Sequence, residues 1–117
     1  MAIFETLTPA EQARHLANPM GTIGIAVADW LYENNKQGNA RIVASLGVEA
    51  GCRVLEIGFG NGRAVPQVIA QAADVQYSGI DISPTMVAES FRLQRRSGCG
   101  RQGQLSVGIG GAHAVCR

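Results

Sequence analysis

The sequence predicts an α/β fold in which helices lead into a βαβα unit. Three observations carry this prediction. Helical periodicity fills much of the first 50 residues, two short apolar runs follow at 53–57 and 75–80, and each run precedes a segment with helical features. At 117 residues, the chain has room for a single domain.

The first helix is predicted by the segment TPAE at residues 8–11. Thr8 and Glu11 have the spacing of a capping box, and proline at the first helical position already has a helical φ. A helix should therefore run from Pro9 to Ala17 and end before Pro19.

Two further helices are predicted in residues 23–46. The first carries an apolar stripe at i, i+3, i+4, i+7 and i+8, which consists of Ile23, Ala26, Val27, Trp30 and Leu31. It should end near Asn34-Asn35, and a shorter helix should cover Ala40 to Leu46, with Gly47 closing it. Residues 1–50 thus form an N-terminal helical segment, which we interpret as scaffold, with direct contact to a substrate as the alternative.

The βαβα unit occupies residues 51–90. Arg53 to Ile57 is predicted to be a buried strand, and Val65 to Ala72 has helical spacing. Val75 to Ile80 is predicted to be the second strand, and Ser83-Pro84 is the N-cap and first position of a helix that continues to about residue 90. Such a pattern predicts parallel strands joined by a right-handed crossover.

Composition divides the chain in two. Residues 1–90 hold five basic and all nine acidic residues, whereas residues 91–117 hold five arginines, six glycines and no acid. The latter segment also lacks a sustained period, apart from a short apolar stretch at Leu105–Ile109 that could pair as a strand. We therefore expect an Arg/Gly-rich C-terminal tail, disordered over 91–117.

Composition also limits the class of protein. No apolar run approaches the roughly 20 residues of a membrane helix, and acids stand where a signal peptide would be basic, so a cytoplasmic protein without membrane contact is expected. The three cysteines form no C-x-x-C pair and accompany only two histidines. Neither a disulfide framework nor a metal site is expected.

A glycine-rich turn, VLEIGFGNG at residues 54–62, separates the first strand from its helix. Glycines at 58, 60 and 62 let backbone amides approach a ligand where a Cβ would obstruct. Arg63 stands where a dinucleotide fingerprint would have its third glycine, and no Gly-Lys-Ser/Thr follows to make a P-loop. Asp81, at the end of the second strand, can accept both hydroxyls of a ribose.

Together these residues carry a family resemblance. Glu56-x-Gly58-x-Gly60-x-Gly62 after a strand, with Gly79-Ile80-Asp81-Ile82-Ser83 ending the next, resembles the cofactor half of class I S-adenosylmethionine-dependent methyltransferases. The small-molecule group that includes the ubiquinone and menaquinone methyltransferases is the most similar. The resemblance covers residues 1–90 and implies an incomplete Rossmann-like methyltransferase fold.

The resemblance implies a role for each matching residue. Gly58, Gly60 and Gly62 would bring backbone against the methionine and ribose parts of S-adenosylmethionine. Glu56 would brace the loop by accepting amide hydrogen bonds. Asp81 would bind the ribose hydroxyls, and the neighbouring side chain, Ile82, would pack on the adenine. Arg63 could attract the cofactor carboxylate, although a solvated arginine is also compatible with its position.

The family's acceptor-side segments have no counterpart here. Those segments follow the second strand and present acidic residues to the cofactor and near the transferred methyl, whereas this chain has no acid after Glu89. Catalytic residues therefore stay unknown, and the apolar sides of the strands should lack part of their cover. We expect a truncated methyltransferase with negligible activity toward an unidentified small-molecule acceptor.

Two hypotheses could explain the unusual composition of residues 91–117. One is that residues 91–117 are an out-of-frame translation of a GC-rich gene, which would account for the abrupt change in composition near Phe91. The alternative is a small non-enzymatic interaction protein whose arginines bind RNA or an acidic partner. Nucleic acid is the weaker expectation, because the tail has no aromatic residue after Phe91 on which bases could stack.

Overall fold

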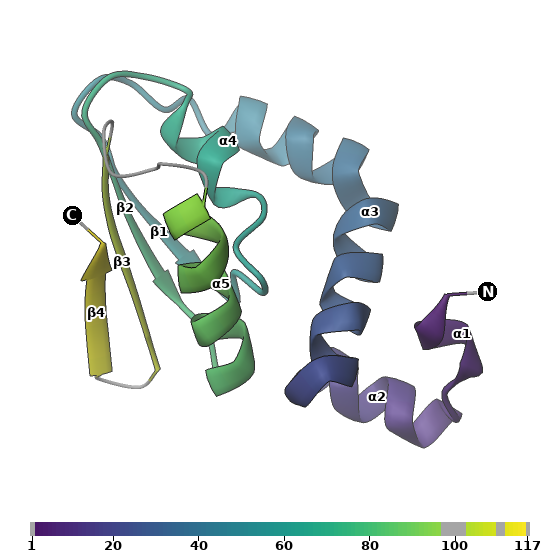
Figure 1. Ribbon diagram of the computed structural model, residues 1–117. Helices are drawn as coiled ribbons and strands as arrows, with labels where there is room; N and C mark the ends of the chain where they lie inside the picture. Colours follow the sequence, from purple (N-terminus) through teal and green to yellow (C-terminus); the bar gives the residue numbers. More distant parts are fainter. Residues whose placement is uncertain (1, 97–102, 110–111, 117) are drawn as a thin grey trace.

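The computed structural model describes residues 2–96, 103–109 and 112–116, with side chains described up to Arg96. Within these ranges the chain forms five helices and four strands (Figure 1): α1 Ile3–Thr6, α2 Pro9–Ala17, α3 Gly21–Ser45, β1 Arg53–Ile57, α4 Val65–Ile69, β2 Val75–Ile80, α5 Pro84–Arg96, β3 Gly103–Ile109 and β4 Ala112–Cys116. The predicted α/β fold is confirmed, and α2, β1 and β2 have the predicted bounds.

The strands form one sheet in the order β1-β2-β3-β4. β1 and β2 are parallel, as predicted, with Ile57 beside Ile80. β2 and β3 are also parallel, and β4 returns antiparallel to β3. Because parallel strands end at the same edge, the residues that follow Ile57 and Ile80 meet there.

The predicted capping box of α2 is present. The Thr8 hydroxyl accepts a hydrogen bond from the Glu11 amide (3.3 Å), and the Glu11 carboxylate accepts one from the Thr8 amide (2.9 Å). Two orphan amides at the helix start are thereby satisfied.

The prediction of two separate helices in residues 23–46 is wrong, because α3 is continuous over 25 residues. Asn34 does not end the helix; its side-chain amide donates to the Trp30 carbonyl one turn earlier (2.8 Å). Gly38 keeps a negative φ, and the helix stops only before Gly47, whose φ of 63° is the predicted C-terminal signal.

Within the described ranges, no helix is long and apolar enough to cross a membrane.

An unpredicted short helix, α1, packs on α3. The rings of Phe4 and Trp30 stack with centroids 4.3 Å apart. The Gln12 side-chain amide adds a link by donating to the Phe4 carbonyl (2.9 Å). The N-terminal helices therefore form one packed segment.

The expectation of disorder over 91–117 is wrong for the part of this segment that the structure describes. α5 continues beyond residue 90, and β3 and β4 extend the sheet, with β3 containing the stretch 105–109. β3 pairs despite its glycines because its backbone supplies the partners that the β2 edge requires, and this contribution does not depend on side-chain pattern. Residues 97–102, 110–111 and 117 lie outside the described residues, so the expectation is not tested there.

α5 continues because its last turns are held by polar contacts. Gln94 is 1% exposed and donates its side-chain amide to the Gly62 carbonyl (2.8 Å). Arg92 binds Glu89 one turn earlier, with its Nε 2.7 Å from a carboxylate oxygen. Hydrophobic periodicity does not register such contacts.

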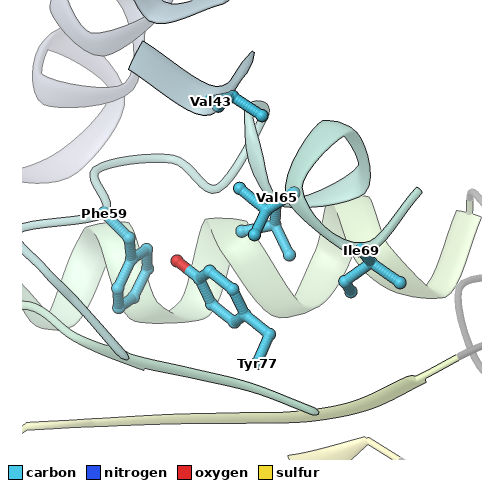
Figure 2. Packing of buried hydrophobic residues seen from close by; sticks show 6 residues of the cluster. Val43, Phe59, Val65, Ile69 and Tyr77 are labelled. Atoms are coloured by element: carbon cyan, nitrogen blue, oxygen red, sulfur yellow. The ribbon is translucent and has the colours of Figure 1, made fainter. Parts of the chain in front are cut away.

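Helices α4 and α5 cover one face of the sheet. Figure 2 shows the cluster of buried residues from α3, the glycine loop, α4 and β2, made of Val43, Phe59, Val65, Val68, Ile69 and Tyr77. Val87 and Phe91 of α5 pack against it. On the opposite face Leu55, Ile57 and Ile80 are 60%, 80% and 38% exposed. The strands therefore lack part of their cover, as expected, and β1 is not buried on both faces as its apolar run predicts.

Candidate functional site

The candidate site lies where β1 and β2 end. The Gly58 amide donates to the carbonyl of Ile80 (2.7 Å), so the start of the glycine loop is tied to the last residue of the neighbouring strand. Asp81 follows at once. The two halves of the sequence motif, 23 residues apart at Gly58 and Asp81, are thus brought together by the parallel register.

Gly58 and Gly60 need the conformational freedom of glycine. Their φ angles are 76° and 63°, and a Cβ built on either would meet no atom within 4 Å. Since L-residues rarely adopt such angles, the requirement at both positions is backbone conformation. The space above both residues is open, as a loop that receives a ligand against its backbone requires.

Between these two glycines, Phe59 turns inward and anchors the loop. Its ring is 6% exposed and lies over Gly79, where an added Cβ would stand 2.7 Å from the Phe59 ring and 3.1 Å from the Tyr77 ring. Figure 2 shows both rings in the core. Gly79 is therefore needed to make room for the loop's anchor.

Gly62 packs closely against α5, and its predicted contact with the cofactor stays a prediction. Its φ is 74°, and a Cβ there would lie 2.3 Å from the hydroxyl oxygen of Ser90 on α5. The residue is glycine so that the loop can pack closely on α5, where Gln94 also binds its carbonyl. Close approach at Gly62 is to a helix of this chain.

Asp81 holds the loop and faces the cavity. One carboxylate oxygen accepts the Gly60 amide (2.9 Å) and the other accepts the Ser83 amide (2.8 Å), with the side chain 7% exposed. A carboxylate has about four acceptor positions, so capacity for ligand hydroxyls is left. Ile82 is 68% exposed beside it, and its side chain offers an apolar surface.

Glu56 does not have the partner predicted for it. The hydroxyl of Tyr77 donates to its carboxylate (2.5 Å), in place of the loop amides. Two causes raise the pKa of the Tyr77 hydroxyl: burial of the ring is the larger, and the hydrogen bond to Glu56 is the second. The hydroxyl therefore keeps its proton at physiological pH and acts as a hydrogen-bond donor. Glu56 is thus fixed from the core side at the loop's entrance.

Arg63 contacts α3. Its guanidinium lies 4.2 Å from the centre of the Tyr32 ring and pairs with Glu33 (2.8 Å) and Asp29 (3.4 Å), all on α3. Both acids are about half exposed, so solvent screens these ion pairs and weakens them. The expected solvated arginine is instead a link between the loop and α3.

Asp29 and Asn61 form a second link that the sequence did not reveal. The side-chain amide of Asn61 donates to Asp29 (2.9 Å), and its oxygen accepts the Arg63 amide (3.2 Å). Asn61 is 5% exposed, so its polar groups depend on these partners. No periodicity or motif joins residues 32 positions apart; only the motif position of Asn61 inside the glycine loop hinted at a role.

The turn between α2 and α3 contacts the other half of the site. The Ser83 hydroxyl donates to the Pro19 carbonyl, and the Gly21 amide donates to the Thr85 hydroxyl (3.1 Å). The N-terminal helices, interpreted as scaffold from sequence, are therefore bonded to both the glycine loop and the start of α5. They form a wall of the site.

A cavity of about 850 Å³ opens between this wall and the strand ends. Its lining includes Glu56, the loop from Gly58 to Asn61, and Asp81 with Ile82, together with apolar residues of α2 and α3. The carboxylates in this lining can accept hydrogen bonds from ligand hydroxyl groups, and the apolar side chains can pack against apolar parts of the same ligand.

Comparisons with known proteins agree with this architecture. No family model matches the sequence. Over 64 residues the chain is 33% identical to the uncharacterized methyltransferase YdaC of Bacillus subtilis (strain 168), a match that covers 55% of this chain and 35% of that protein. The chain therefore spans about a third of the length of the curated relative it matches.

Solved structures show the same arrangement of elements. The YcgJ protein from Bacillus subtilis superposes with a TM-score of 0.52 at 19% identity, covering 63% of this chain and 30% of that one. A geranyl diphosphate methyltransferase in complex with S-adenosylmethionine superposes with a TM-score of 0.51 at 18% identity, covering 83% and 40%. The fold is that of the Rossmann-like methyltransferases. What the chain contains is the part with the N-terminal helices and the first parallel strands.

Proposed function

We propose that this chain binds S-adenosylmethionine at the glycine loop and belongs to a methyltransferase that uses this cofactor. The observation that carries the proposal is the hydrogen bond from Gly60 to Asp81 at the meeting ends of β1 and β2. It places a carboxylate with spare acceptor capacity against an open glycine backbone. The likeness to YdaC and the fold shared with a methyltransferase that holds S-adenosylmethionine support the same cofactor.

Each residue has a role in this proposal. Asp81 accepts the ribose hydroxyls while it keeps its two amide bonds. The exposed side chain of Ile82 packs on the adenine, and the open backbone at Gly58 and Gly60 borders the methionine part. Glu56, held by Tyr77, faces the cavity and can accept from the cofactor's amino group.

The proposed reaction is methyl transfer to a small-molecule acceptor. When bound, the cofactor supplies an activated methyl group on a sulfonium, so the protein contributes chiefly by positioning both reactants. The described residues include no evident general base for the acceptor, and the catalytic residues stay unknown. We propose that this chain carries the cofactor half of the site and that, alone, it binds weakly and turns over negligibly.

Titration with S-adenosylhomocysteine tests the proposal. Isothermal calorimetry, with ligand-detected NMR for weak binding, should show a saturable complex with an affinity weaker than micromolar. Asp81→Ala should weaken it by about a hundredfold or more, because two charge-assisted hydrogen bonds of about 1.5–3 kcal/mol each are lost. Asp74→Asn, an acid at the opposite end of β2, is the matched control and should leave binding unchanged.

Three results would count against parts of this proposal. Absence of binding at millimolar ligand rejects the cofactor site. Equal binding by Asp81→Ala and the unaltered chain rejects the assigned ribose contact. Micromolar affinity rejects the expectation that the chain holds only part of the pocket. Membership of the ubiquinone and menaquinone group stays a prediction. Titration of this chain with quinone precursors in the presence of S-adenosylhomocysteine would test it.

A further inference from the structure

The glycine loop is held from two opposite sides. On the sheet side, Asp81 accepts the amide of Gly60 (2.9 Å). On the helix side, Asp29 of α3 accepts the side-chain amide of Asn61 (2.9 Å). Gly60 and Asn61 are adjacent, so two carboxylates from distant parts of the chain fix two consecutive residues of the loop.

Asp29 also fixes the residue where the loop becomes α4. The same oxygen that accepts from Asn61 lies 3.4 Å from the Arg63 guanidinium, and the Asn61 oxygen accepts the Arg63 amide (3.2 Å). These contacts span the second half of the loop, from Asn61 to Arg63. A shift of Asp29 would therefore move the backbone that faces the cavity.

We propose that Asp29 is a positioning residue for the cofactor site, which acts through Asn61 to hold the glycine loop in its binding conformation. The inference rests on the proposed function for its effect on ligand affinity, but its effect on the loop does not. It assigns to α3 a part in binding that neither the glycine motif nor the strand ends contain.

Glu33 provides the contrast that defines this role. It lies one turn further along α3, carries the same charge, and pairs with the same arginine (2.8 Å). Its hydrogen bonds and ion pairs are with Arg63 and Lys36, and none reaches the loop residues 58–62. If charge near Arg63 were what mattered, the two acids would be equivalent; if the bond to Asn61 matters, only Asp29 is needed.

Four variants of the full chain separate these cases. Asp29→Ala removes the acceptor, Asp29→Asn keeps an acceptor oxygen but removes the charge, Asn61→Ala removes the donor, and Glu33→Gln is the matched control. Amide hydrogen exchange at Gly62 and Arg63 reports on the loop without ligand. The Gln76 amide, which binds the Cys52 carbonyl (2.9 Å) near the start of β2, is the remote reference. Titration with S-adenosylhomocysteine then reports on affinity.

Asp29→Ala should speed exchange of the two loop amides by about tenfold, equivalent to about 1.4 kcal/mol, and weaken binding by a similar factor. Exchange at Gln76 should not change. Asp29→Asn should restore both readouts to within about threefold, and the double variant Asp29→Ala/Asn61→Ala should be no worse than Asn61→Ala, because the two residues act through one bond. Glu33→Gln should resemble the unaltered chain.

Wild-type loop exchange in Asp29→Ala overturns the proposal, and so does a failure of Asp29→Asn to restore it. If loop exchange behaves as expected but the unaltered chain binds no ligand, the hold of Asp29 on the loop is supported while the proposed function fails. If the ligand binds and Asp29→Ala binds it equally well, the proposed function stands and the positioning role is overturned.

Discussion

The two faces of the sheet differ sharply, although β1 carries apolar side chains on both. Toward α4 and α5, Val75 and Tyr77 are 0% and 1% exposed. Toward the other side, Leu55 and Ile57 are 60% and 80% exposed. Strands that are apolar on both faces are typical of sheets covered on both sides. The covered face alone therefore accounts for the stability that the sheet gains within the described part of this chain.

The candidate site depends on the covered face. Tyr77, whose ring is in the core, binds Glu56 through its hydroxyl, and Phe59 anchors the glycine loop on Gly79. Packing and ligand binding thus share residues. The comparison of the two faces teaches that damage to the covered face should affect both stability and the site. Changes on the open face should affect stability little, although Leu55 and Ile57 also line the cavity.

The largest effect is expected from Tyr77→Ala. Loss of a buried aromatic side chain costs about 3–5 kcal/mol in free energy of unfolding. The matched variant Ile57→Ala, on the open face, should stay within about 0.5 kcal/mol of the unaltered chain. Urea unfolding followed by circular dichroism measures both.

Tyr77→Phe separates the contribution of the Tyr77 hydroxyl from that of its ring. It keeps the ring and removes the hydroxyl that binds Glu56, so a loss of about 1.5–3 kcal/mol, the range for a hydrogen bond to a charged group, is expected. Comparable losses for Ile57→Ala and Tyr77→Ala would show that the open face is covered in solution and would remove the contrast.

A loss of about 2–5 kcal/mol in the free energy of unfolding is expected from Gly62→Ala. A side chain at a positive φ costs about 1–2 kcal/mol, and crowding against Ser90 adds about 1–3 kcal/mol. Gly51→Ala, with a φ of 76° and no atom within 4 Å of the new Cβ, should show only the first cost. Thermal unfolding of both variants checks this; equal losses would mean that the contact with α5 is unimportant.

The elements of the fold were predictable where local signals decide them. The capping box at Thr8 and Glu11 fixed the start of α2, and the two apolar runs gave the bounds of both strands of the motif. The predicted helix end near Asn34 was wrong because an asparagine inside a helix can donate its side-chain amide to a carbonyl of the preceding turn, as Asn34 does to Trp30. Disorder was wrongly expected over residues 91–96 because a buried glutamine does not contribute to hydrophobic periodicity.

The candidate site was predictable only in its motif residues. Asp81 and the glycines were found because strand ends and positive-φ positions leave a pattern in sequence. The partners were not: Glu56 binds Tyr77, Arg63 binds α3, and Asp29 reaches Asn61. Such pairings depend on how separate elements pack, which a single sequence does not encode at any fixed spacing.

The smallest expected effect on stability comes from the carboxylate of Glu89 on α5, which binds Arg92. The hydrogen bonds from Arg92 lower the pKa of Glu89 below its ordinary value of 4.5, so ionised Glu89 stabilises the folded chain. For a carboxyl with a lowered folded-state pKa, this stabilisation is present above the unfolded-state pKa and is lost as the pH falls through the folded-state pKa.

Glu89→Gln should therefore be less stable than the unaltered chain near pH 7, and the difference should shrink once the pH falls below 4.5. Urea midpoints between pH 7 and pH 3 measure it, with Glu49→Gln as the control for loss of one exposed negative charge. A difference that persists unchanged at pH 3 would mean that Glu89 stabilises α5 by packing alone.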